Sequence, residues 1–316
     1  MSPSEVGRLA ALRGRLPAYE APPRRRARQA LRTALALTRP EVWPLPSGVG
    51  AFWWDGHPNF GDALTPWLLP HLGVVPVLAA PSDAQVAGVG SILEMLPEQF
   101  GGVIWGSGSM YGLPLRLPDA TVAAVRGPLT RDLLDVGQQA SVALGDPGLL
   151  VARLMRRPSV KHAVGVVPHG SHRGRPEFAA LTSAAPGEVS QVLTYQPVHR
   201  VLRHIASCEA ILTTSLHGLI VADSFGIPAA WAMPEELMGG RFKFEDYEKV
   251  VTPGRTREIA LDPSTTLAEV LRSVRTPDAD RVRASQDDLM RAAALIPRRP
   301  LARVVFGRGV NRDVQT

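Results

Sequence analysis

One histidine stands where acid–base or phosphate chemistry is expected. The apolar run 210–212 ends in the hydroxyl residues Thr213, Thr214 and Ser215, and His217 follows at once. A strand that ends in Ser or Thr before a helical pattern predicts a helix beginning near Ser215. The free N–H groups and dipole at that end favour an anion, and a histidine on the first turn can protonate or pair with a phosphate. The alternative is a buried histidine that only caps its own strand.

A second group of polar residues follows the first predicted strand, 48–54. Asn59, Gly61 and Asp62 lie between that strand and a predicted amphipathic helix, 62–72. Gly61 permits a tight turn of the backbone, and Asp62 is predicted to bind or deprotonate a hydroxyl group. A plain loop in which Asp62 caps the next helix explains the same residues equally well.

The strand predicted at 102–105 ends in small residues. Gly106, Ser107 and Gly108 supply N–H groups and space for an anion or a sugar. They include the first two glycines of a dinucleotide fingerprint, but Tyr111 occupies the third position, so NAD binding is not inferred.

Four ionisable residues follow other predicted elements. Arg126 closes the strand 121–125 and is predicted to clamp a carboxylate or phosphate, with a surface salt bridge as the alternative. His169 follows a later strand and is either a second histidine of the site or simply exposed. Lys243 lies in a charged, aromatic segment that closes over a ligand or begins a solvated helix. Asp146, in a Gly-Asp-Pro turn, is predicted to cap a helix.

The charge of the chain is concentrated at its start. The first 40 residues hold nine arginines and two glutamates, a net charge of +7, whereas all 316 residues together carry +6. The remainder is near neutral, so the chain lacks the basic face of a nucleic-acid-binding protein, and no nucleic-acid partner is predicted. The basic segment 1–45 is predicted to be a partly disordered arm that contacts anionic membrane, or else a merely solvated leader.

Several chemistries are excluded by composition. Cys208 is the only cysteine, which rules out an intramolecular disulfide and a thiolate zinc site and fits a reducing compartment. The histidines form no metal-binding spacing, so no metal site and no cofactor are predicted. A Walker lysine and a Gly-x-Ser-x-Gly elbow are both missing. No apolar run spans a membrane and no secretory signal begins the chain, so we expect a cytoplasmic protein, peripheral to the inner face of the membrane.

Strands alternate with helices through most of the chain, mainly as continuous apolar runs, which predicts an α/β fold with parallel sheets. The pattern restarts near residue 157. We therefore expect two Rossmann-like domains, 46–157 and 158–316, facing each other across a cleft that the strand-end loops line. A long helix at 278–295 is expected to pack back on the first domain.

Taken together, the motifs resemble the polysaccharide pyruvyltransferase family. They occur in the family's order over residues 50 to 250. They are Asn59-Phe-Gly-Asp62, Gly106-Ser-Gly108, Val125-Arg-Gly127, Gly145-Asp-Pro147, Thr214-Ser-Leu-His-Gly218, Gly226-Ile-Pro228 and Lys243 to Tyr247.

The resemblance implies a fold like the two-domain GT-B glycosyltransferases, with the acceptor on the first domain and the donor on the second. It implies transfer of pyruvate from phosphoenolpyruvate to a sugar of a polysaccharide or of its lipid-linked precursor, as a ketal. His217 would act as the acid or stabilise the departing phosphate, and Asp62 would act as the base. Arg126 and Lys243 would hold the donor's carboxylate or phosphate.

This chain departs from the family at Ser215, where many members have Arg. Arg126, His169, Arg241 or Lys243 would have to supply the missing charge. Two other functions remain compatible with the motifs. One is a GT-B glycosyltransferase that uses a nucleotide sugar, and the other is a relative that binds a glycan without catalysis.

Overall fold

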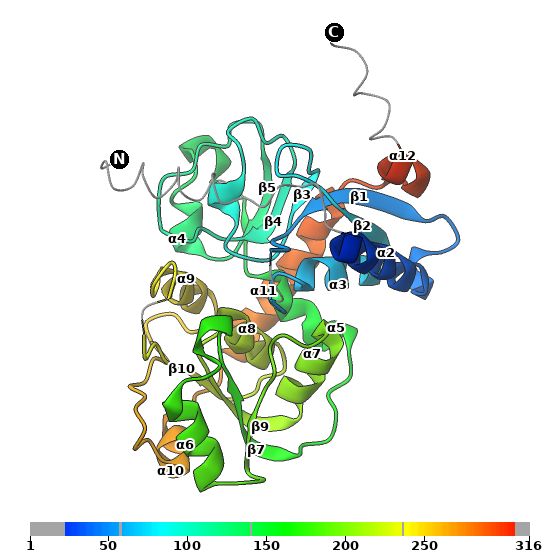
Figure 1. Cartoon of the computed structure of the whole chain (residues 1–316). Coiled ribbons are helices and arrows are strands. Elements are labelled where there is room, and N and C mark those ends of the chain that lie inside the picture. Colours follow the sequence, from blue (N-terminus) through cyan, green and yellow to red (C-terminus); the bar gives the residue numbers. More distant parts are fainter. Residues whose placement is uncertain (1–22, 57–58, 140, 236, 307–316) are drawn as a thin grey trace.

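The computed structural model describes residues 23–56, 59–139, 141–235 and 237–306. Its strands form two separate sheets, in which neighbouring strands run parallel except at one edge (Figure 1). The predicted α/β class with parallel sheets is therefore confirmed.

The first sheet has seven strands and is built mostly from the amino-terminal half. Strand β1 pairs in parallel with β2 and β3, and β4, β5 and β6 follow in chain order; β11 pairs antiparallel with the start of β1. The bounds are β1 Ser47–Phe52, β2 Val74–Leu78, β3 Val86–Ala87, β4 Val103–Ser107, β5 Thr121–Val125, β6 Ala143–Leu144 and β11 Arg299–Pro300. The inner strands β1, β3 and β4 are almost wholly buried, as their continuous apolar runs predict, whereas β11 is exposed.

The second sheet has four parallel strands in the order β10-β9-β7-β8. They are β7 His162–Val167, β8 Val189–Gln191, β9 Cys208–Thr213 and β10 Ala229–Trp231. One hydrophobic cluster contains residues of both sheets, including Val49 and Trp105 from the first and Ile211 and Trp231 from the second. The sheets thus share a continuous core. A domain boundary near residue 157 and a cleft between two domains stay predictions.

Helices cover the sheets and fill the space between them. In the first part of the described chain they are α2 Pro23–Leu37, α3 Leu64–His71, α4 Pro128–Arg131 and α5 Val151–Leu154. The second sheet carries α6 Pro176–Ala184, α7 Val198–Ala206, α8 Leu216–Ser224 and α9 Phe242–Val251. The last helices are α10 Leu267–Ser273, α11 Ala279–Ala292 and α12 Leu301–Phe306. Every residue of α8 is buried, and α8, α9 and α11 lie between the two groups of strands (Figure 1).

The carboxyl-terminal helix predicted at 278–295 corresponds to α11 and one following 3-10 turn. It contacts the first sheet: the Trp105 indole donates a hydrogen bond to the Leu289 carbonyl, and the Ser285 hydroxyl donates one to the Leu144 carbonyl. The segment after Gly127 forms only the single turn of α4, and a short 3-10 turn lies further on at Val136–Gln138.

The basic amino-terminal segment is partly structured, which corrects the prediction of an arm for its later residues. Residues 23–37 form α2, which packs against β2 and α3 and buries Ala36. Arg28 and Arg32 form ion pairs with Asp55, with N–O distances of 2.7 and 3.0 Å. The predicted disorder of residues 1–22 lies outside the described residues.

Candidate active site

His217 lies on the first turn of α8, directly after the carboxyl end of β9, as the sequence predicts. Ser215 is the N-cap residue of α8, but its side chain makes no capping hydrogen bond; its N–H donates to the Thr213 hydroxyl. Within the described chain, the N–H groups of residues 216–218 have no acceptor. This end of α8 therefore keeps unsatisfied donors that can bind an anion.

The imidazole of His217 is held by backbone and side chains of the first sheet's loops. A β-carbon added to Gly61 would lie 2.5 Å from His217 Cγ and 2.8 Å from Cε1, so the ring packs directly on the Gly61 backbone. Phe60 meets the same ring edge-on, with 6.4 Å between centroids. The residue is 8% exposed, and Nε2 has no hydrogen-bond partner among the residues that the structure describes. Nε2 therefore caps no strand within the described residues.

A carboxylate that sequence reasoning treated as structural faces this imidazole. Asp146 Oδ2 lies 3.6 Å from His217 Nε2. The other oxygen, Oδ1, accepts a hydrogen bond from the Gly148 N–H, so the predicted capping role is confirmed. Asp146 thus has two roles, and the second was missed because its partner is distant in sequence. The only local signal was its place at the carboxyl end of a parallel strand.

Asp62 is the second buried carboxylate of the site. It does not cap α3, whose N-cap residue is Ala63; instead its Oδ2 accepts a hydrogen bond of 2.5 Å from the Asn59 amide. The side-chain oxygen of Asn59, Oδ1, accepts a hydrogen bond from the Gly61 N–H, so Asn59 fixes the turn that presents Asp62 and Gly61. The reading of this turn as a plain capped loop is therefore wrong.

The pKa of the Asp62 carboxyl lies close to neutral pH. Its pKa is raised to about 6, chiefly by burial and in part by the charge of Asp146, while His217, Lys243 and the Asn59 hydrogen bond oppose the rise. Burial also lowers the pKa of Lys243 to about 8, with Arg126 adding to the decrease and Asp62 opposing it. Ionisable groups with such shifts, gathered at strand ends, are typical of catalytic sites.

The structure corrects the prediction that Lys243 lies in a loop that closes over a ligand or at a solvated helix start. It belongs to α9, where it is buried together with Phe244, Asp246 and Tyr247. Its Nζ donates a hydrogen bond to the Met238 carbonyl, which leaves two of its protons available.

The structure corrects the prediction that Arg126 clamps a carboxylate or phosphate of the substrate. Its guanidinium is 1% exposed and each of its nitrogens donates to the protein: Nε to Asp246, Nη1 to Ser91 and Nη2 to the Ser109 carbonyl. The ion pair with Asp246 joins the end of β5 to α9. Arg126 therefore holds the framework together and acts on the site through its field on Lys243.

The space and hydrogen-bonding groups around the small residues after β4 are also taken up by other parts of the protein. The Gly108 N–H donates to the Gly90 carbonyl, and the Ser107 hydroxyl bonds to the Gly88 carbonyl. A β-carbon at Gly106 would collide with Pro147, and one at Gly108 with Arg126. The N–H groups of Met110 and Tyr111 donate to the buried Glu94 carboxylate. Gly106, Ser107 and Gly108 thus permit close packing, and the expected donors for an anion are not free at Gly108.

His169 lies at the carboxyl end of β7, beside the turn that carries His217. Its N–H donates to the Thr214 hydroxyl, and its Nδ1 lies 2.8 Å from the Ser171 hydroxyl. The neighbouring His172, which the sequence did not single out, is buried with no partner for Nδ1 among the described residues. Burial lowers the pKa of His172, which favours its neutral form.

Parallel sheets with ionisable groups gathered at their carboxyl ends define this chain as an α/β protein with an enzyme-like site. Within the described ranges, no group of three or more His, Cys, Asp or Glu side chains is arranged to hold a metal, and no helix is long and apolar enough to cross a membrane.

Residues 115–232 match the family model of polysaccharide pyruvyl transferases. The succinoglycan biosynthesis protein ExoV of Rhizobium meliloti (strain 1021) is 30% identical over 233 residues, which cover 70% of this chain and 69% of that protein. The chain therefore belongs to the polysaccharide pyruvyl transferase family. The matched range includes Asp146 and His217, whereas Asp62 and Lys243 lie outside it.

Two other proteins are more limited matches. The uncharacterized protein L143 of Acanthamoeba polyphaga mimivirus is 30% identical over 117 residues, or 35% of this chain and 40% of that protein. A crystal structure of the uncharacterized Klebsiella pneumoniae protein KP1_0663 aligns with a TM-score of 0.35 and 13% identity, covering 73% of this chain and 98% of the other. We draw no conclusion from this structural likeness.

Proposed function

We propose that this protein transfers the pyruvyl group of phosphoenolpyruvate to two hydroxyls of one sugar, in a polysaccharide or its lipid-linked precursor. Family membership supports pyruvyl transfer in polysaccharide biosynthesis. The observation that carries the proposal is the imidazole of His217, which lies at an anion-binding helix end with Asp146 at 3.6 Å and beside Gly61 and the buried Asp62. The proposal includes a GT-B-like division, with the acceptor bound on the side of the first sheet and the donor mainly by residues 158–316.

The reaction needs an acid, a base and a site for phosphate. Protonation of the methylene carbon of phosphoenolpyruvate makes C2 electrophilic, and one sugar hydroxyl adds to it. A second hydroxyl then forms the other C–O bond as the bond from C2 to the phosphate oxygen breaks. Of the two hydroxyl protons released, one replaces the proton given to the methyl carbon and the other leaves with phosphate.

The residues have complementary roles in this scheme. The N–H groups at the start of α8 bind the phosphate, and protonated His217 supplies the proton while Asp146 orients its ring. Asp62, with a pKa of about 6, is ionised at pH 7 and accepts a hydroxyl proton. Lys243, with a pKa of about 8, is cationic at that pH. It supplies the positive charge for donor binding that is missing here because Ser215 stands where many family members have Arg. Arg241 is a weaker replacement, because its guanidinium forms an ion pair with Glu258.

The test is incubation of the full chain with phosphoenolpyruvate and candidate glycans, with phosphate release and the mass of the glycan as readouts. We expect His217→Ala to lower turnover by about 10²–10⁴-fold, the usual contribution of general acid catalysis. His162→Ala is the matched control, since His162 lies at the opposite end of the second sheet, at the start of β7. Near-normal turnover in folded His217→Ala would remove His217 from the mechanism.

Ligand-induced thermal shifts separate the alternatives, because a ligand that binds only the native state raises its stability. Stabilisation by phosphoenolpyruvate but not by UDP or CMP supports pyruvyl transfer. Stabilisation by a nucleotide alone would indicate a nucleotide-sugar glycosyltransferase. Glycan binding with no donor binding and no turnover would indicate a non-catalytic relative.

A further inference from the structure

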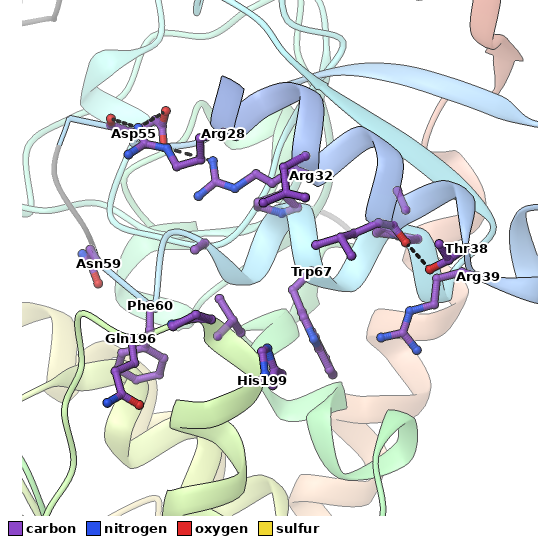
Figure 2. Close-up of a pocket in the computed structure, with 18 of the residues that line it drawn as sticks. Arg28, Arg32, Thr38, Arg39, Asp55, Asn59, Phe60, Trp67, Gln196 and His199 are labelled. Carbon is purple, nitrogen blue, oxygen red and sulfur yellow. Dashed lines mark hydrogen bonds and ion pairs between the residues drawn. The ribbon is translucent and has the colours of Figure 1, made fainter. Parts of the chain in front are cut away.

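A cavity of about 670 Å³ lies beside the candidate site and has no role in the chemistry described above. Its walls are α2, α3 and the segment from Tyr195 to His199 that leads into α7. This volume lies within the range of small-molecule binding sites. Figure 2 shows Trp67 among its lining side chains, with Asn59 and Phe60 toward one side and Arg39 toward the other.

One end of the cavity adjoins the candidate catalytic residues. Asn59 and Phe60 line it, and both also touch the site: the Asn59 amide donates to Asp62 and the Phe60 ring meets His217. A molecule that fills the cavity would therefore extend to the groups proposed to act on a sugar hydroxyl.

The cavity has a net positive charge. Arg28, Arg32 and Arg39 line it, and Asp55 is the one carboxylate among the described lining residues. Asp55 forms ion pairs with Arg28 and Arg32, while Arg39 has no ion-pair partner in the part of the chain that the structure describes. Figure 2 shows Arg39 on the side of the cavity away from Asn59 and Phe60. The unpaired cation therefore lies opposite the end beside Asp62.

The remaining walls suit sugars. Trp54, Trp67 and Tyr195 present aromatic surface, and the Tyr195 side chain is 49% exposed. Aromatic faces with a few polar groups hold the apolar faces of sugar rings and orient their hydroxyls. Leu31 and Leu35, 59% and 57% exposed, line the wall that α2 forms.

We propose that this cavity binds the acceptor as an anionic glycan, with its reacting sugar beside Asn59 and its anionic group at Arg39. The inference rests on the proposed function and names the acceptor's place and chemical class. The anionic group is either a carboxylate on the glycan or a phosphate that joins it to a carrier. The helix α2, which the sequence suggested was part of a loose arm, is then a wall of the acceptor site.

Calorimetric binding to the full chain, without donor, tests this proposal. The probes are cellotetraose as the neutral glycan, a hyaluronan tetrasaccharide as the carboxylate and a farnesyl-diphosphate-linked disaccharide as the phosphate. At least one acidic probe should bind about tenfold more tightly than the neutral one, and which of the two does so identifies the anionic group. Raised salt should reduce the preference.

Two cavity variants and one control sharpen the result. Arg39→Ala should abolish the preference for acidic probes, and Tyr195→Ala should weaken every glycan about tenfold. Arg255→Ala, an exposed arginine outside the cavity, should change nothing. Failure of all three probes to bind, or binding that neither cavity variant alters, overturns the inference.

The readouts also separate this inference from the proposed function. If the glycans bind as expected but phosphoenolpyruvate yields no product, the proposed function fails while the cavity keeps its assignment as a glycan site. If pyruvyl transfer occurs and the KM for the acceptor is unchanged in both cavity variants, the inference fails alone.

Discussion

Gly61→Ala should disable the candidate site while leaving the fold intact. The His217 ring packs on the Gly61 backbone, and an added β-carbon would stand 2.5 Å from Cγ. The ring cannot tolerate that contact, since ordinary carbon contacts begin near 3.4 Å. Gly61 has no positive φ, so alanine fits the backbone and only the imidazole has to move.

The displacement sets the expected loss of activity. Restoring an ordinary contact moves the ring by about 0.9 Å or more, which is the difference between the two distances. A misplacement of about 1 Å in a catalytic group costs on the order of 10²-fold in rate. The same overpacking should lower the free energy of unfolding by about 1–3 kcal/mol.

The assay is phosphate release from phosphoenolpyruvate with a competent glycan, alongside a thermal melt of each variant. Gly101→Ala is the matched control, because a β-carbon there would meet only the Asp119 carbonyl oxygen, at 3.9 Å. We expect Gly101→Ala to match wild type in turnover and Gly61→Ala to lose about 10²-fold.

Full turnover in a folded Gly61→Ala variant would refute the reasoning, because it would mean that the ring position does not control the reaction. An equal loss in Gly101→Ala would show that the effect is not specific to the contact with His217.

Other measurements follow from the same site. The rate constant kcat/KM should rise with pH through about 6 as Asp62 ionises and fall above about 8 as Lys243 loses its proton; a flat profile over this range would contradict both roles. The raised pKa of Asp62 means that the folded state loses stability as the pH rises from about 4 through about 6. Asp62→Asn should therefore be more stable than wild type by about 1–3 kcal/mol at pH 8, with no such gain at pH 4. The same variant should lose activity. Asp246→Ala should cost about 3–5 kcal/mol because it leaves Arg126 buried without its ion pair, and a loss under 1 kcal/mol in denaturant titration would argue against that. Deletion of residues 1–38 should destabilise the protein, since it removes α2 from its packing on β2 and α3; an unchanged melting temperature would show that the helix contributes little.

The sequence predicted those features that depend on neighbouring residues. The strand at 121–125 and the place of His217 on a helix after a strand follow from local apolar runs, hydroxyl residues and terminating glycine and proline. The identity of Asp62 as a candidate was also visible locally, from its place in a glycine turn after the first strand.

The sequence could not reveal pairs between distant segments. Asp146 and His217 are 71 positions apart, and Arg126 and Asp246 are 120 apart, so nothing local shows that one meets the other. The charges at 242–247 favoured a segment that closes over a ligand or begins a solvated helix. Instead, Lys243 and Asp246 are buried within α9, and Asp246 pairs with the distant Arg126. The spacing of Phe244, Tyr247 and Val251 was the available signal for a helix with a buried face.

The closure of the first sheet by β11 and α11 has a consequence for synthesis. These segments leave the ribosome well after β1 to β6, yet β11 borders β1 and α11 covers Trp105 and Leu144. A nascent chain therefore keeps apolar surface of these strands uncovered until α11 and β11 emerge. Such surface promotes aggregation, so shortened products that end before residue 279 should depend on chaperones or be degraded.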